Sequence, residues 1–289
     1  MLKYDNKNWF SFIFRHGSKH VEGMWMSVVF MALLTTGLIF LNEETQWLNL
    51  EISTTFHTVL GLVLGLLLVF RTNSAYDRWW EGRKQLGALV NTTRNLALKI
   101  KLYVKAEDYS KRDEVLHLIY AFAYTMKEHL REEDYSEVQK EVPKATLSKF
   151  EKAKHKPNLI LHEIGEALKE MYKQELISGE QLIVLETETH LLINILGACE
   201  RIRNTPIPMA YALHLKRVLL IYALTLPFGF VGQLHWWSIP VVIIVFYTMV
   251  GIELIGEEIE DPFGLDENDL PVDELCEKIK ANILEISSF

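Results

Sequence analysis

The sequence lacks the short motifs of the common enzyme classes. It contains no G-x-S-x-G nucleophile motif, no phosphate-binding P-loop and no H-E-x-x-H zinc motif. Its ten histidines are dispersed along the chain, and its two cysteines, Cys199 and Cys276, do not form a C-x-x-C pair. We therefore expect neither a disulfide framework nor a catalytic function, and we predict that the protein is not an enzyme.

Basic residues are also missing from long parts of the chain. The formal net charge is -8, and no basic stripe stands apart from acidic neighbours, which argues against nucleic acid as a partner. All 30 Lys and Arg residues lie outside four apolar runs, at residues 24–41, 55–70, 218–231 and 238–256. Such runs predict four membrane crossings, although the second is short for a helix surrounded by lipid.

The two segments between paired crossings indicate the orientation. Residues 42–54 carry three glutamates and no Lys or Arg, and residues 232–237 carry no Lys or Arg either. Since cytoplasmic loops are enriched in basic residues, both chain termini and the large polar block are expected in the cytoplasm. The predicted divisions of the chain are 1–70 (N-terminal segment and first two crossings), 71–216 (cytoplasmic domain), 217–256 (last two crossings) and 257–289 (acidic tail).

The polar block shows helical periodicity. The first predicted helix, at 110–131, has one apolar stripe: Val115, Ile119, Phe122, Met126 and Leu130. Further helices are predicted at 158–176, 178–203 and 272–286, and Ser178 with Gln181 resembles a capping box. Pro143 and Pro157 are interpreted as marking a charged connection.

The rest of the chain is organised around residues 58–94. Residues 59–70 are apolar, and no proline occurs between Arg71 and Val104, so one helix is expected to leave the membrane and continue into water. Leu62, Leu66 and Phe70 recur every four residues and share a face. They either contact lipid and protein core or form a hydrophobic constriction of a pore. Gly61 and Gly65 form a G-x-x-x-G pair that permits close helix packing.

Two motifs resemble the bestrophin family of ion channels. The first is R-T-N-S-A-Y-D-R-W-W-E at 71–81, with its triplet Arg78, Trp79 and Trp80, and the second is the acidic stretch 259–274 after the last crossing. The resemblance implies an all-α integral membrane protein of the bacterial inner (cell) membrane. Each subunit would have four transmembrane helices and a helical cytoplasmic domain, and five identical subunits would surround a central pore. It also implies that Leu62, Leu66 and Phe70 form the pore's neck.

Polar residues extend the same helical face. Asn73 and Asp77 are expected to line the cytoplasmic vestibule, unless Asp77 pairs with Arg78 or Arg83. The resemblance places a second constriction, the cytoplasmic aperture, at Glu180. The alternative for Glu180 is an ordinary acidic residue in a first helical turn, where the helix dipole favours it.

Four acidic residues correspond to positions where animal members of the family bind calcium: Glu258, Asp261, Asp266 and Asp269. Their oxygens suit calcium, the only cofactor the sequence suggests. We favour the alternative, in which Arg or Lys side chains of a neighbouring helix neutralise this cluster and no cofactor is bound.

These observations predict passive conduction of small monovalent ions. The glutamates of the outer segment and Glu180 favour cations, whereas animal relatives of the family conduct chloride, so an anion channel is the alternative. A different class, a membrane scaffold that binds a partner through its cytoplasmic domain, is also compatible with the sequence. The expected partners are membrane lipid, further copies of the chain and the ions themselves.

Overall fold

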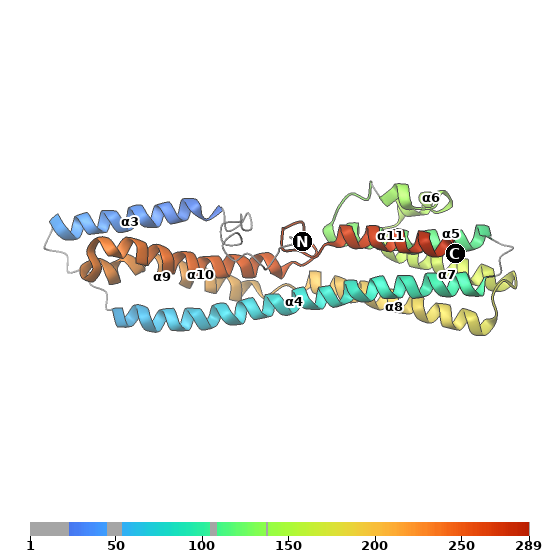
Figure 1. Cartoon of the computed structure of the whole chain (residues 1–289), viewed down its shortest axis with the longest axis horizontal. Coiled ribbons are helices and arrows are strands. Elements are labelled where there is room, and N and C mark those ends of the chain that lie inside the picture. Colours follow the sequence, from blue (N-terminus) through green and yellow to red (C-terminus); the bar gives the residue numbers. More distant parts are fainter. Residues whose placement is uncertain (1–22, 45–53, 105–108, 137, 289) are drawn as a thin grey trace. The chain divides into compact units, whose positions relative to one another are not determined.

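The computed structural model describes residues 23–44, 54–104, 109–136 and 138–288. The predicted N-terminal segment before the first crossing and most of the acidic segment at 42–54 therefore lie outside the described residues. Every regular element in the described ranges is a helix (Figure 1). The chain forms two compact units: unit 1 contains Met1–Trp79 and Pro206–Asp269, and unit 2 contains Trp80–Thr205 and Leu270–Phe289.

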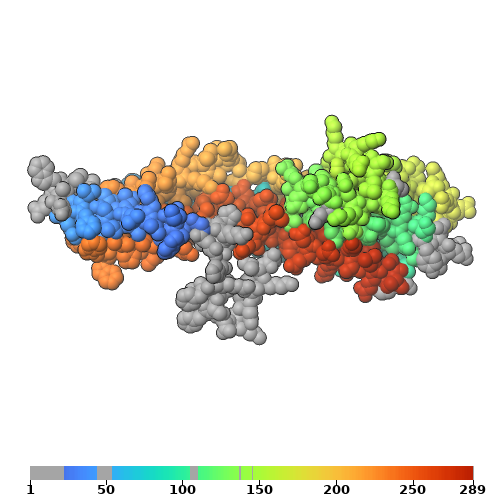
Figure 2. Space-filling model, turned by 90° about the horizontal axis from the view of Figure 1, so that it is seen from above, coloured from blue at the N-terminus to red at the C-terminus, as the bar shows by residue number. Residues whose placement is uncertain are grey.

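Unit 1 is built from long apolar helices. These are α3 (Trp25–Glu44), the first part of α4 (Thr54–Tyr103), α9 (Met209–Leu234) and α10 (Ser238–Glu260), with the short 3-10 turn η2 (His235–Trp237) between the last two. Helix α3 packs along α9 and α10, as the blue and orange segments in Figure 2 show. The predicted crossings therefore correspond to helices, and α9 continues through Pro227.

Four stretches of the described residues are long and apolar enough to cross a membrane: Trp25–Glu43, Thr54–Tyr103, Gly179–Asn204 and Met209–Glu260, the last of which contains both α9 and α10. The stretch Gly179–Asn204 is α8, which the sequence analysis assigned to the cytoplasmic domain. In the structure α8 packs on α5 and α7 of unit 2 through buried residues such as Leu185, Leu192 and Cys199. This packing accounts for the buried apolar residues of α8, whereas Ile183, Leu191 and Ile193 remain exposed.

Helix α4 contributes one stripe to the core of unit 1. Leu64, Leu68, Arg71 and Ala75 follow one another at helical spacing, and each is at most 2% exposed. Leu64 and Leu68 share an apolar cluster with residues of α3, α9 and α10. Because α4 contains no proline, it continues as a single helix of 50 residues, as predicted.

Of the two glycines in the G-x-x-x-G pair, Gly61 alone makes a close contact in the described residues. A Cβ atom added at Gly61 would lie 2.8 Å from the hydroxyl oxygen of Tyr222 on α9, so any larger residue here would force the Tyr222 side chain to shift. At Gly65 no atom of the described residues lies within 4 Å of such a Cβ. The predicted close approach is therefore made at Gly61, and it is made to a side chain.

A buried ion pair joins three segments of unit 1. Arg71 is 2% exposed, and its Nη1 lies 2.6 Å from Oε2 of Glu260, the last residue of α10. The other carboxylate oxygen of Glu260 accepts a hydrogen bond from the backbone N–H of Ile207, just before α9, at 2.8 Å. The backbone oxygen of Glu260 accepts a hydrogen bond from Arg78 Nε at 3.0 Å. Glu260 thus connects the end of α10 both to α4 and to the segment just before α9.

Unit 2 is a helical bundle around α5 (Tyr109–Arg131). Helix α5 contacts α7 (Lys156–Lys173), α8 (Gly179–Asn204), α11 (Val272–Ser288) and the 3-10 turn η1 (Val138–Glu141), and the end of α4 also belongs to this unit. The predicted stripe of α5 is buried, with every member at most 4% exposed. Residues on its other faces, such as Leu118 and Ala121, are buried too, because partner helices surround it.

The interpretation of the region between Pro143 and Pro157 as a connection was wrong. Helix α6 occupies Lys144–Lys152, begins after Pro143 and packs on α7. Its buried residues, Thr146 and Phe150, are four apart and lie among charged neighbours. Two buried residues in nine give a weak periodic signal, which explains why this short helix was missed.

We predict that Glu260→Ala destabilises the protein by about 3–5 kcal/mol, because it leaves the Arg71 guanidinium buried without its counter-charge. The matched control is Glu257→Ala, which removes a half-exposed partner of Lys216 and should cost at most about 1 kcal/mol. Thermal unfolding of the purified protein in detergent measures both. Equal losses of stability in Glu260→Ala and Glu257→Ala would contradict the importance of the Arg71–Glu260 ion pair.

Candidate ion pathway

The predicted neck residues lie on a face of α4 that no other described part of the chain covers. Leu62, Leu66 and Phe70 are 77%, 57% and 56% exposed. The buried stripe through Leu64 and Leu68 lies on the opposite face, since two residues along a helix turn it by about 200°. In a folded subunit this exposed apolar face must meet lipid, another subunit or a narrow pore.

Asn73 and Asp77 extend this face with polar side chains, and both are exposed. None of the ion pairs observed in the described part of the chain involves Asp77. Arg78, one of its two suggested partners, instead donates a hydrogen bond to the backbone of Glu260. In the described residues, no ion pair therefore joins Asp77 to Arg78 or to Arg83.

The signature triplet holds the acidic segment that follows α10. Trp79 Nε1 donates a hydrogen bond to the backbone oxygen of Asn268 at 3.0 Å, and its ring stacks on Tyr76 at a centroid distance of 6.1 Å. Arg78 holds Glu260 in the same way, whereas Trp80 is 49% exposed. The triplet was identified from its sequence motif, but its hydrogen bonds and ring stacking were not predicted.

Sequence reasoning missed the roles of Arg71 and Glu260. The available signal was a charge at the edge of an apolar run: Arg71 directly follows the apolar residues 59–70, and Glu260 ends the helix of the last crossing. A charge in such a place needs a counter-charge, but the spacing alone does not reveal which residue provides it.

The four calcium candidates do not converge. Glu258 and Asp269 are buried, whereas Asp261 is exposed and Asp266 is also accessible. Across the described residues, no three of these carboxylates lie close enough together to share one ion. Asn268 donates its amide to Glu258 at 3.0 Å, and the backbone N–H of Asp266 binds Asp269 at 2.7 Å. In the described residues these four side chains are therefore not gathered around one point, and calcium binding stays a prediction; the mechanism proposed below does not involve calcium.

Asp269 is held in a tight loop. Its Oδ2 atom would lie 2.6 Å from a Cβ added at Gly264, so glycine leaves the room that this carboxyl occupies. Its Oδ1 atom is buried and has no hydrogen-bond partner in the described residues. Burial, reinforced by the charges of Asp266, Asp261 and Glu258, raises the pKa of Asp269 to about 7.

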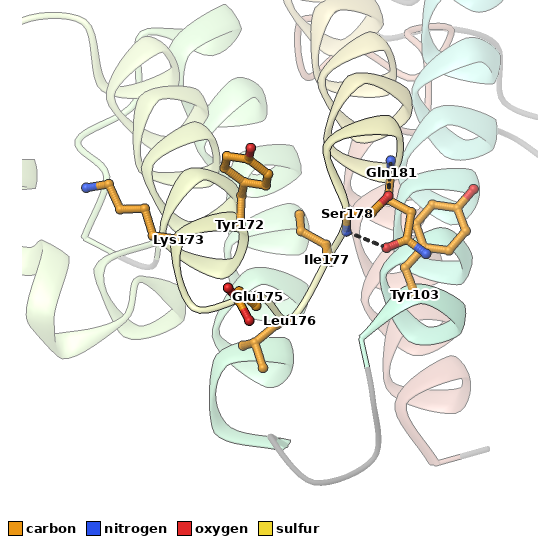
Figure 3. Close-up of a pocket in the computed structure, with 8 residues that line it drawn as sticks. All are labelled: Tyr103, Tyr172, Lys173, Glu175, Leu176, Ile177, Ser178 and Gln181. Atoms are coloured by element: carbon orange, nitrogen blue, oxygen red, sulfur yellow. Dashed lines mark hydrogen bonds between the residues drawn. The ribbon is translucent and has the colours of Figure 1, made fainter.

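Glu180 lies in the first turn of α8, as predicted. The Ser178 side chain accepts the backbone N–H of Gln181 at 3.3 Å, and the Gln181 side chain accepts the backbone N–H of Ser178 at 2.8 Å, which confirms the capping box (Figure 3). The Ser178 hydroxyl also donates to Glu180 at 2.7 Å, and this hydrogen bond lowers the pKa of the exposed Glu180 carboxyl. Glu180 therefore presents a negative charge to solvent at neutral pH.

A pocket of about 620 Å³ lies beside this helix start, within unit 2. Figure 3 shows Tyr103, from the end of α4, next to Ser178 and Gln181, with Tyr172 and Lys173 at the end of α7. This pocket could not be predicted from the sequence, because its residues come from three separate helix ends.

We predict that Asp269→Asn stabilises the protein increasingly as the pH rises from 5 to 8. The raised pKa means that folded Asp269 keeps its proton up to about pH 7, whereas the unfolded residue loses it near 3.8. The stability of the wild type therefore falls over this range, and asparagine removes that fall. Melting temperatures against pH measure the effect, with Glu186→Gln, an exposed carboxylate of unit 2, as control. An advantage of Asp269→Asn that shrinks with rising pH would contradict the assignment.

Residues 1–285 match the family model described as "Bacterial/Fungal Bestrophin protein". A relative in Nostoc sp., named voltage-dependent anion channel-forming protein alr2987, is 40% identical over 98% of this chain and 92% of its own. The Escherichia coli (strain K12) protein named voltage-dependent anion channel-forming protein YneE is 29% identical over 99% of this chain and 94% of its own.

The fold is also similar to a solved structure. A bacterial bestrophin homolog from Klebsiella pneumoniae superimposes with a TM-score of 0.86 at 26% identity, over 92% of this chain and 98% of that chain. The helices of both units, the two sequence motifs and these matches agree. The chain is an all-α membrane protein with ion-channel relatives, and it belongs to the bacterial and fungal bestrophin family.

Proposed function

We propose that five copies of the chain form a channel that conducts small monovalent ions passively and favours cations. The observation that carries this proposal is the exposed face of α4, where Leu62, Leu66 and Phe70 are followed by polar Asn73 and Asp77. A pore neck that opens into a water-filled vestibule is expected to show this order, with apolar residues in the crossing and polar ones on the same face beyond it. One chain has too few crossings to enclose a pore, so a symmetric ring supplies the missing wall.

In this ring each neck residue is repeated around the axis. Three stacked apolar rings, from Leu62, Leu66 and Phe70, form a barrier that is permeable only while it stays wet or widens. The buried face of α4 supports this arrangement, because Leu64 and Leu68 fix the helix against α9 and leave the neck residues pointing away from the subunit core.

Negative side chains supply the preference for cations. Asp77 is exposed and lacks an ion pair in the described residues, and Glu180 is exposed and ionised at neutral pH. Repeated in a ring, such charges raise the local concentration of cations and repel anions. Anion conduction is the second candidate, since the relatives that match this chain over most of its length are named anion channel-forming proteins.

The proposed location is the inner membrane of a bacterium, with both termini in the cytoplasm. The distribution of Lys and Arg supports this orientation, because neither segment between paired crossings contains a basic Lys or Arg residue.

The test is a measurement of reversal potential in planar bilayers under a salt gradient, using the purified protein. We expect the wild type to reverse towards the cation equilibrium potential, and Glu180→Gln to lower the cation-to-anion permeability ratio about twofold or more. Glu186→Gln, an exposed residue on another face of α8, should leave the ratio unchanged. Reversal at the anion potential would establish the second candidate, and the absence of any current would contradict both.

A further inference from the structure

Two histidines of unit 2 meet at one carboxylate oxygen. His129 Nε2 and His155 Nε2 each lie 2.8 Å from the same Oε1 atom of Glu200. The two imidazole rings have a centroid distance of 4.6 Å and are inclined at 45°. One ligand atom from each of the three residues lies within 4.8 Å of the others, and this is the one such group of three found in the described residues.

The three side chains come from three helices. His129 lies near the end of α5, His155 is the N-cap of α7, and Glu200 lies on α8. Arg203, one turn beyond Glu200, donates a hydrogen bond to the backbone oxygen of His129 at 3.0 Å and forms an ion pair with Glu132. The arrangement is therefore held by contacts of α8 with the end of α5 that do not depend on the imidazole rings.

We propose that His129, His155 and Glu200 bind a divalent transition-metal ion of the zinc class. Two imidazole nitrogens and one carboxylate oxygen form a common ligand set for zinc, with a fourth position left to water. The side chains are 22%, 36% and 26% exposed, so an ion and its water can reach the group. The nitrogen-to-oxygen distances of 2.8 Å need to lengthen by roughly half an ångström or slightly more, since tetrahedral ligands about 2.0–2.2 Å from zinc lie about 3.3–3.6 Å apart.

One hydrogen bond opposes metal binding and limits its strength. His155 Nδ1 accepts the backbone N–H of Asn158 at 3.2 Å and thereby caps α7. With the metal on Nε2, the proton of the neutral imidazole must be carried on Nδ1, so this cap is lost. Loss of a typical N-cap lowers the folding equilibrium constant about fivefold. The binding of zinc by three ligands contributes a much larger factor. We therefore expect binding, weaker than that of a structural zinc finger.

A bound ion would crosslink α5, α7 and α8 within unit 2. The site does not depend on the proposed conduction, because it is argued from one subunit and its binding is measured without current.

The test uses the purified full-length protein in detergent, stripped of metal. Cobalt(II) is titrated as a spectroscopic probe, followed by competition with zinc. All proteins carry His16→Gln and His20→Gln, because two histidines four residues apart in the N-terminal segment offer a competing pair. We expect one cobalt ion per chain with the intense visible absorption of tetrahedral coordination, displaced by zinc.

His129→Gln and Glu200→Gln should each weaken binding about tenfold or more. His155→Ser removes the ligand but retains a side chain that caps α7, so it should lose the metal while keeping the wild-type circular dichroism and melting temperature. The exposed His162→Gln on α7 is the matched control and should bind normally. The proposal is overturned if no tetrahedral cobalt spectrum appears, or if these ligand variants bind as tightly as the control.

Discussion

The buried Arg71–Glu260 ion pair is the interaction on which unit 1 depends most. A guanidinium with 2% exposure at the end of an apolar run requires a counter-charge, and Glu260 provides it at 2.6 Å. Glu260 also binds the backbone ahead of α9 and, through its own backbone oxygen, Arg78 of the signature motif. These contacts determine where α10 ends and which face of α4 turns inward. The exposed face of α4 is a consequence, because the helix can present only one stripe to the subunit core.

The two opposite faces of α4 link the packing of the subunit to the proposed conduction. Leu64 and Leu68 belong to the core, whereas Leu62, Leu66 and Phe70 are more than half exposed in the described part of the chain. The proposed channel uses this second face as its wall, and Asn73 and Asp77 continue it with side chains that water can solvate. In this proposal, stability and permeation depend on opposite faces of one helix. Substitutions on the two faces should have separable effects.

The sequence predicted features that depend on local spacing. The uninterrupted α4, the apolar stripe of α5 and the capping box at Ser178 each follow from residues within a few turns of one another, and all three were confirmed. Features that depend on distant residues were not predicted. The Arg71–Glu260 pair joins positions 189 residues apart, and the His129–His155–Glu200 group joins three helices whose order in space no periodicity reveals. Helix α6 was missed for another reason, since nine residues give too little periodicity.

The most direct test of the central claim is cysteine accessibility along α4 during bilayer recording. Both native cysteines are buried and shielded from a reagent in water, so the wild type provides an unreactive background. We predict that a charged methanethiosulfonate reagent, which reacts with thiols exposed to water, changes the current through Leu66→Cys. It should leave Leu64→Cys, on the opposite face, and Leu220→Cys, equally exposed on α9, unaffected. Modification of the current in Leu64→Cys or Leu220→Cys but not in Leu66→Cys would contradict the assignment of this face of α4 to the ion pathway.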